Sequence, residues 1–141
     1  MRLFEGRAVG IATVWAEARS EPFEGQVAVA EVILKRADTG YSSDGTIEGT
    51  VLRPKQFSCW NESTPWRSKI LALDFDDPWV QRAADAWDAA AAGSEFSKGA
   101  VLYHTIQAPK GVKSWPPYWA KAKSVIETVR IGGHVFYAVR G

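Results

Sequence analysis

Residues 22–37 restrict the fold of this chain more than any other segment. Beyond the first turn of this predicted helix, apolar side chains occupy almost every face, and the polar interruptions are few: Gln26, Glu31, Lys35 and Arg36. A helix that is apolar nearly all round must be enclosed by other elements, so it is predicted to run through the middle of a domain. Pro22 is expected as its first residue.

Two longer helices are predicted on either side of this central one. The apolar pattern of residues 7–19 favours a helix with a wide buried face, which should end near Ser20 because Pro22 disfavours helical geometry in the residue before it. The pattern over residues 78–92 predicts another helix, with Asp77 as its N-cap and a glycine as its stop.

The remaining predicted elements are short. Thr46 is expected to cap a helix over residues 47–52. Residues 100–105 and 134–139 cluster Val, Leu, Phe and Tyr, which favours strands, whereas residues 118–129 are predicted to form a helix. Because helices and strands do not alternate as a parallel sheet requires, we predict an α+β fold that is mainly helical, with a small antiparallel β element. The 141 residues fit one domain.

Composition excludes several classes of function. The net charge is +1, with basic and acidic residues interspersed, which argues against nucleic acid as a partner. No segment approaches the roughly 20 apolar residues of a membrane span, and the N-terminal stretch contains Glu5 and lacks the apolar run of a signal peptide. We therefore expect a monomer made in the cytoplasm, exported by a partner, by lysis, or as part of a longer parent protein.

Tryptophan is unusually frequent, and two interpretations of this surplus remain open. One is a large aromatic core, in which each indole N–H needs a hydrogen-bond partner. The other is a groove whose flat apolar walls stack against sugar rings. The seven residues concerned are Trp15, Trp60, Trp66, Trp79, Trp87, Trp115 and Trp119.

Glu17 is the candidate for acid catalysis. It lies at the end of a predicted apolar helix, directly after Trp15 and Ala16, where a chain break lets a side chain face a cleft. A carboxyl group with apolar neighbours keeps its proton to higher pH, as a general acid near neutral pH must. The alternative is a helix-end carboxylate paired with Arg19 or Arg36.

Other titratable residues are weaker candidates. Glu21 is interpreted as a structural residue that accepts backbone N–H groups at the turn between two helices, and Glu24 as a favourable first-turn charge. His104 and His134 cannot form a zinc site unaided, and Cys59 has no base beside it in the sequence. We therefore expect no metal and no cofactor, and a small buried cysteine.

A long block of the sequence resembles the signature of the SleB-type cell wall hydrolases, the spore cortex-lytic family. Residues 15–30 match W-x-E-A-R-G-E-x-x-x-G-Q-x-A-V-A, and residues 32–36 continue the match as V-I-L-K-R, where relatives have V-I-L-N-R. Further matches follow in the same order: Gln56-Phe57-Ser58 with Trp60, Ala100 to His104, Trp119-Ala120, Ile131-Gly132, His134 and Phe136-Tyr137.

Two positions depart from the family pattern. Ser20 replaces a glycine, so the backbone there is not expected to need a positive φ. Lys35 replaces an asparagine, which removes any hydrogen bond that the amide makes in relatives.

The resemblance implies a lysozyme-like, lytic transglycosylase-like domain that acts on the glycan strands of peptidoglycan. It places the family's catalytic glutamate on Glu17 and gives Glu21 and Arg19 supporting roles. The residues matched to family motifs are the expected substrate contacts: Gln26, Phe57, Ser58, Trp60, Tyr103, His104, Trp119 and Tyr137.

The expected reaction cleaves the bond between N-acetylmuramic acid and N-acetylglucosamine. In a lytic transglycosylase the muramic acid 6-hydroxyl closes a 1,6-anhydro ring, whereas attack by water at the same site would make a muramidase. A cell-wall amidase and a non-catalytic glycan-binding module are the less favoured alternatives. A phage endolysin, a virion-borne lysin or an excised domain all suit a bare catalytic domain of this kind.

Overall fold

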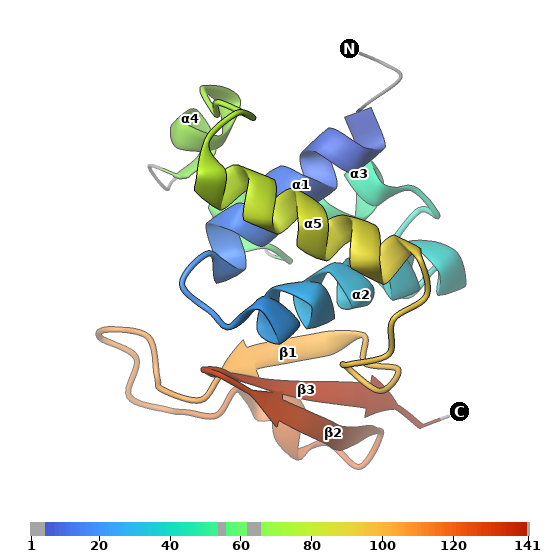
Figure 1. Cartoon of the computed structure of the whole chain (residues 1–141). Coiled ribbons are helices and arrows are strands. Elements are labelled where there is room, and N and C mark those ends of the chain that lie inside the picture. Colours follow the sequence, from blue (N-terminus) through green and yellow to red (C-terminus); the bar gives the residue numbers. More distant parts are fainter. Residues whose placement is uncertain (1–4, 54–55, 62–65, 141) are drawn as a thin grey trace.

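The computed structural model describes residues 5–53, 56–61 and 66–140. Its helices pack together on one side of the molecule, and a small sheet lies beneath them (Figure 1). The helices are α1 (Glu5–Ala18), α2 (Phe23–Thr39), α3 (Ile47–Val51), α4 (Trp66–Leu71) and α5 (Pro78–Ala91), with 3-10 helices at Ser58–Trp60 and Tyr118–Lys121. The strands are β1 (Leu102–Thr105), β2 (Val125–Ile131) and β3 (His134–Val139). This architecture confirms the predicted mainly helical α+β class.

Helix α2 is the central helix, as its apolar sequence predicts. It packs against α1, α3 and α5 and lies over the sheet (Figure 1). Pro22 is its N-cap rather than its first residue, because a ψ of 155° is extended, and the helix continues past the predicted end to Thr39. Gly40, with a φ of 78°, ends it in the left-handed conformation that glycine adopts without strain.

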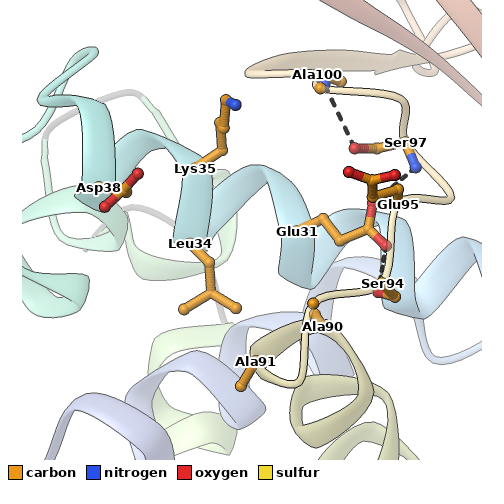
Figure 2. Close-up of a pocket in the computed structure, with 12 residues that line it drawn as sticks. Glu31, Leu34, Lys35, Asp38, Ala90, Ala91, Ser94, Glu95, Ser97 and Ala100 are labelled. Atoms are coloured by element: carbon orange, nitrogen blue, oxygen red, sulfur yellow. Dashed lines mark hydrogen bonds between the residues drawn. The ribbon is translucent and has the colours of Figure 1, made fainter.

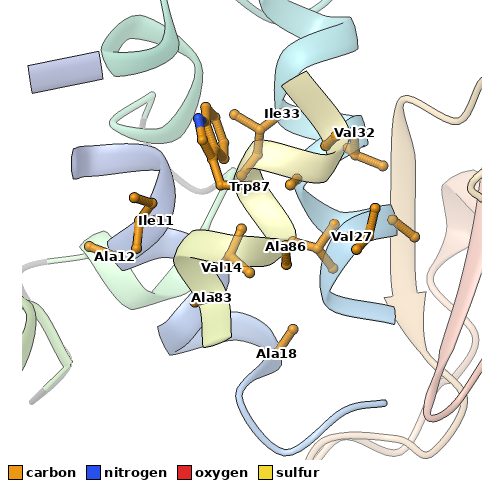
Figure 3. Close-up of a cluster of buried hydrophobic side chains, with 14 of the residues drawn as sticks. Ile11, Ala12, Val14, Ala18, Val27, Val32, Ile33, Ala83, Ala86 and Trp87 are labelled. Atoms are coloured by element: carbon orange, nitrogen blue, oxygen red, sulfur yellow. The ribbon is translucent and has the colours of Figure 1, made fainter. Parts of the chain in front are cut away.

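The core lies where α1, α2 and α5 meet (Figure 3). Ile11 and Val14 of α1 and Ile33 of α2 are completely or almost completely buried there. Trp87 of α5 lies directly on α1, because a Cβ atom at Gly10 would be 2.4 Å from its ring. Of the tryptophans whose side chains the structure describes, Trp87 is the one that the core encloses, with 3% of its surface exposed.

The predicted starts of α3 and α5 are confirmed by their caps. The Thr46 hydroxyl accepts a hydrogen bond from the backbone N–H of Gly49 at 2.9 Å. The Asp77 carboxylate accepts one from the backbone N–H of Trp79 at 2.8 Å, and Pro78 follows as the first helical residue. Both caps satisfy N–H groups that the first turn of a helix leaves without partners.

The prediction of a helix over residues 118–129 is wrong. Only Tyr118–Lys121 forms a helical turn, and from Val125 the chain is strand β2. Its β-branched residues suit a strand, and β3 offers it an antiparallel partner across the two-residue turn Gly132–Gly133. The sheet order is β1-β3-β2, so β3 is central. None of the helices in the described ranges combines the length and apolar character that crossing a membrane requires.

Candidate active site

Glu17 lies in the last turn of α1, just before the chain turns into α2. The residue is half-buried, and its Oε1 accepts a hydrogen bond from the Tyr103 hydroxyl at 3.0 Å. The Cys59 thiol lies near enough to this carboxyl group to lower its pKa. Strand β1 and the 3-10 helix Ser58–Trp60 therefore each bring one polar side chain to the end of α1.

Burial raises the pKa of Glu17 above the usual value of a glutamate, and Tyr103 and Cys59 offset only part of this rise. The pKa values of Tyr103 and Cys59 are also raised, first by burial and then by the nearby charge of Glu17. Both groups therefore stay protonated and remain donors. The arrangement keeps the carboxyl group neutral to higher pH and still supplies donors for the carboxylate that forms when the proton leaves.

Tyr103 is held in place by aromatic rings from two elements. Its ring centroid lies 6.4 Å from that of Phe57 and 5.6 Å from that of Phe136. His134 packs against it edge-on, with centroids 5.0 Å apart. Phe57 is 1% exposed, so its side chain forms a wall behind Tyr103 and has almost no surface of its own to offer a ligand.

The Glu21 carboxylate accepts a backbone hydrogen bond, but not at the turn where the sequence predicts it. Its Oε1 accepts a hydrogen bond of 2.6 Å from the backbone N–H of Gly133, in the β2–β3 turn, and lies 3.8 Å from Nδ1 of His134. A Cβ atom at Gly132 would lie 2.3 Å from the same carboxylate. The turn that Glu21 holds is therefore the one between two strands, and the link joins the helical layer to the sheet.

The structure places two other expected substrate contacts, His104 and Tyr137, on the opposite face of the sheet from Tyr103. In the β1–β3 register Tyr103 pairs with Phe136, whereas His104 pairs with Val135, so adjacent residues point to opposite faces of the sheet. His104 Nε2 and the Tyr137 hydroxyl are 2.8 Å apart on the face away from Glu17. The ring of Trp119 contacts both His104 and Tyr137. This cluster does not contact the Glu17 carboxyl group.

Two more expected contacts are used inside the protein. Gln26 is fully buried, and its amide donates to the backbone oxygens of Arg19 and Glu21 at 3.3 and 3.5 Å, which ties together the turn between α1 and α2. The Trp60 indole N–H donates to the Thr13 hydroxyl at 2.7 Å. The side chain of Ser58 lies outside the described part of the chain.

The two remaining members of the signature lie close to the helix turn. The Arg19 guanidinium stacks over the Trp15 ring at 5.0 Å and donates to the Ala16 carbonyl, in keeping with a supporting role. Ser20 is exposed and does not adopt a positive φ, which confirms that a glycine is not needed there. Arg36, an alternative partner for Glu17, instead donates to the Val101 carbonyl at 2.6 Å.

Pockets lie beside several of these residues. One of about 380 Å³ is lined by Tyr103 and Trp119, and another of about 350 Å³ lies between Trp15 and Trp79. A further pocket, about 520 Å³, lies away from Glu17, between α2 and α5 around Glu31 (Figure 2).

In the pocket around Glu31, the carboxylate is occupied by hydrogen bonds within the protein. Glu31 accepts hydrogen bonds from the Ser94 hydroxyl and from the backbone N–H of Ser97 (Figure 2). It also accepts one from the backbone N–H of Phe96. These contacts fix the loop between α5 and β1. Lys35, where the family has asparagine, lines the same pocket.

Two contributors to the site are not identified as such by the sequence. Cys59 is buried as expected, yet it also lies near enough to Glu17 to lower its pKa. Arg36 lines the pocket beside Tyr103. Its occurrence among the few polar residues of a mostly apolar helix is the one sequence signal that could have marked it.

Comparison with solved structures gives the same fold for two characterised domains. The catalytic domain of the germination-specific lytic transglycosylase SleB from Bacillus anthracis is 28% identical, with a TM-score of 0.68 over 93% of this chain and 92% of that one. The catalytic domain of Bacillus cereus SleB is 27% identical, with a TM-score of 0.68 over 93% of this chain and 88% of that one.

Sequence relatives are spore cortex-lytic enzymes. That of Oceanobacillus iheyensis is 43% identical over 71 residues, which cover 47% of this chain and 25% of the relative. That of Bacillus cereus is 47% identical over 45 residues, which cover 32% of this chain and 17% of the relative. The matched chain spans a quarter or less of the length of these relatives.

The family model of cell wall hydrolases matches residues 20–137, a range that runs from the turn before α2 to the last residues of β3. This range includes Tyr103, Cys59 and the strand pair that positions Tyr103 against α1. The chain belongs to the cell wall hydrolase family.

Proposed function

We propose that this chain degrades peptidoglycan by cleaving the glycosidic bond between N-acetylmuramic acid and N-acetylglucosamine, with Glu17 as the general acid and base. The observation that carries the proposal is the Glu17 carboxyl group, whose pKa is raised by burial and which accepts a hydrogen bond from the Tyr103 hydroxyl. The similarity to a lytic transglycosylase catalytic domain supports the reaction class. The family match begins at residue 20, so the assignment of Glu17 rests on its surroundings and on the resemblance of residues 15–30 to the family signature.

In the proposed reaction, Glu17 gives its proton to the bridging oxygen as the bond to the anomeric carbon of muramic acid breaks. General acid catalysis of this kind contributes roughly 10²–10⁴-fold. The ionised Glu17 then takes the proton of that sugar's own 6-hydroxyl, whose oxygen bonds to the anomeric carbon. The products are an N-acetylglucosamine end and a 1,6-anhydro-muramic acid end, and Glu17 regains its proton.

Water attack, as in a muramidase, is less favoured because of how the second acid of the signature is used. Two-carboxylate glycosidases place the second group about 5–10 Å from the first, facing the sugar. Glu21 is bonded to Gly133 and lies against His134 instead. An intramolecular hydroxyl needs only one carboxylate, which Glu17 supplies.

The test is Glu17→Gln, which keeps the shape of the side chain and removes the titrating proton. We expect turnover of purified sacculi to fall at least about 100-fold while the variant still sediments with them. Glu24→Gln, which removes the same charge from an exposed position on α2, is the matched control and should retain activity.

Mass spectrometry of the products separates the alternatives. Anhydro-muropeptides with intact stems support the proposal, reducing ends identify a muramidase, and free stem amines identify an amidase. Unchanged lysis by the Glu17→Gln protein would rule out the catalytic assignment.

A further inference from the structure

A polar pocket of about 380 Å³ shares a wall with the candidate active site. Tyr103, which donates to Glu17, is one of its lining residues. Other lining residues come from α2 and the segment after it, from the segment before the 3-10 helix Ser58–Trp60, and from the link between β1 and β2. They include Arg36, Tyr41, Gln56, Trp119 and Ser124. The pocket is therefore built from segments far apart in the sequence.

Arg36 is a buried cation in this pocket, and among the described residues it has no partner of opposite charge. Its residue surface is 4% exposed, and no carboxylate in the described ranges forms an ion pair with it. The guanidinium lies 5.2 Å over the Phe57 ring. Buried charges in proteins are usually paired with an opposite charge, because leaving water costs several kcal/mol that a partner offsets.

The hydrogen bonds of Arg36 account for only part of its donors. Nε donates to the Val101 carbonyl at 2.6 Å, and Nη1 donates to Oε1 of Gln56 at 3.2 Å. These bonds tether α2 to the sheet, which explains why a long polar side chain is buried here. A guanidinium carries five N–H groups, so the rest are available to a ligand that enters the pocket.

The surrounding charge also favours an anion. Residues 96–126 contain no aspartate or glutamate but do contain five lysines. Lys121 and Lys123 lie on either side of Ala122, which lines the pocket, and both are exposed. A pocket edged by one sign of charge raises the local concentration of ligands of the opposite sign.

We propose that this pocket binds a carboxylate of the peptide stem attached to muramic acid, with Arg36 as the group that receives it. The inference rests on the proposed function, because Tyr103 places the pocket next to the sugar that Glu17 would protonate. A carboxylate fits the planar donor face of a guanidinium. A phosphate of another wall polymer shares this chemistry, but a stem is covalently attached to the reacting sugar and the pocket has room for an amino-acid-sized group.

The sharpest variant is Gln56→Glu. It places a carboxylate where the amide oxygen now accepts from Arg36, so the cation gains an internal partner and the shape of the pocket is kept. Gln107→Glu is the matched control, because it adds the same charge at an exposed position of the same lysine-rich segment, outside the pocket.

Binding is measured by NMR of the arginine Nε–H signals during titration with N-acetylmuramoyl-L-alanyl-D-glutamate. We expect the Arg36 signal to shift in the wild type and in Gln107→Glu, and affinity to fall about tenfold or more in Gln56→Glu, the size of one lost charge-assisted hydrogen bond. The diamide of the same ligand, which has no carboxylate, should not shift the signal. Binding of the diamide, or equal binding of the ligand by Gln56→Glu, overturns the proposal. A signal that shifts with inorganic phosphate but not with the muramoyl dipeptide overturns it as well.

A kinetic experiment asks whether the pocket serves the reaction. The wild type should show a lower KM on glycan strands that carry stems than on strands stripped by an amidase, and Gln56→Glu should reduce this difference. Equal KM values for the two substrates in the wild type contradict the inference. The NMR titration does not depend on turnover. It therefore still reports ligand binding at Arg36 if the assignment of Glu17 as the acid is wrong.

Discussion

At the residue scale, the candidate acid is defined by three side chains and by how much water they exclude. Glu17 comes from the first helix, Cys59 from the segment before α4, and Tyr103 from the sheet. Burial raises the pKa of the carboxyl group, whereas Tyr103 and Cys59 lower it. Because burial is the larger effect, the pKa is raised, which is the sign that a general acid near neutral pH requires.

Tyr103→Phe is expected to change the pH profile of the enzyme. The hydroxyl stabilises the ionised form of Glu17, so its removal raises the pKa further, and the alkaline limb, where the acid loses its proton, moves up by as much as about one pH unit. The measurement is kcat/KM against pH. Tyr137→Phe removes a hydroxyl on the other face of the sheet and should leave the limb in place. An unmoved limb in Tyr103→Phe would show that this bond does not tune Glu17.

At the element scale, the sheet positions the site by alternation and by its turn. Strand β1 directs Tyr103 toward the helices and His104 away from them. These sequence neighbours therefore have different partners: Tyr103 contacts Glu17, and His104 contacts Tyr137. The β2–β3 turn is joined to the end of α1 through Glu21, which accepts from Gly133. The hairpin thus holds β3 in register beside the strand that carries Tyr103.

Gly132→Ala is expected to loosen this connection. Gly132 has a φ of 55°, and an added Cβ would lie 2.3 Å from the Glu21 carboxylate and 2.6 Å from Pro22. The free energy of unfolding should fall by at least about 2 kcal/mol, since backbone strain and steric overlap add.

Gly111→Ala is the matched control for this substitution. Gly111 has a φ of 85° with no heavy atom within 4 Å of an added Cβ, so only the backbone cost of about 1 kcal/mol applies. Urea denaturation of both variants gives the comparison. Equal losses would mean that the contact with Glu21 is not specific.

At the scale of the whole molecule, burying the candidate acid costs stability. In the unfolded chain Glu17 has an ordinary carboxyl pKa, and folding raises it. Between the two values the folded state binds more protons than the unfolded state, so the free energy of unfolding falls as pH rises through this window.

Glu17→Gln should therefore be more stable than the wild type once the pH exceeds the ordinary carboxyl pKa. The gain is expected to grow between pH ~4 and ~8, by at most about 1.4 kcal/mol for each unit of the pKa shift. Urea denaturation at both pH values measures it, with Glu24→Gln as the exposed control. A gain that is the same at both pH values would exclude titration of Glu17 as its cause.

The sequence alone determined the helical framework and the position of the acid. The apolar stretch of α2, the Asp77 cap of α5 and the break after α1 are local features, since hydrophobic period, capping and proline geometry act within a few residues. The signature around Glu17 is equally local, and it identified the family before any contact was known.

Only the tertiary structure decided what surrounds that acid. The bond between Tyr103 and Glu17 joins residues 86 positions apart, and that between Glu21 and Gly133 joins residues 112 apart. Residues 125–131 became a strand because β3 offered a partner, which no local pattern contains. Burial, which raises the pKa of Glu17 and encloses the Arg36 guanidinium, is likewise a property of the packed chain, because it depends on which distant segments exclude water from each group.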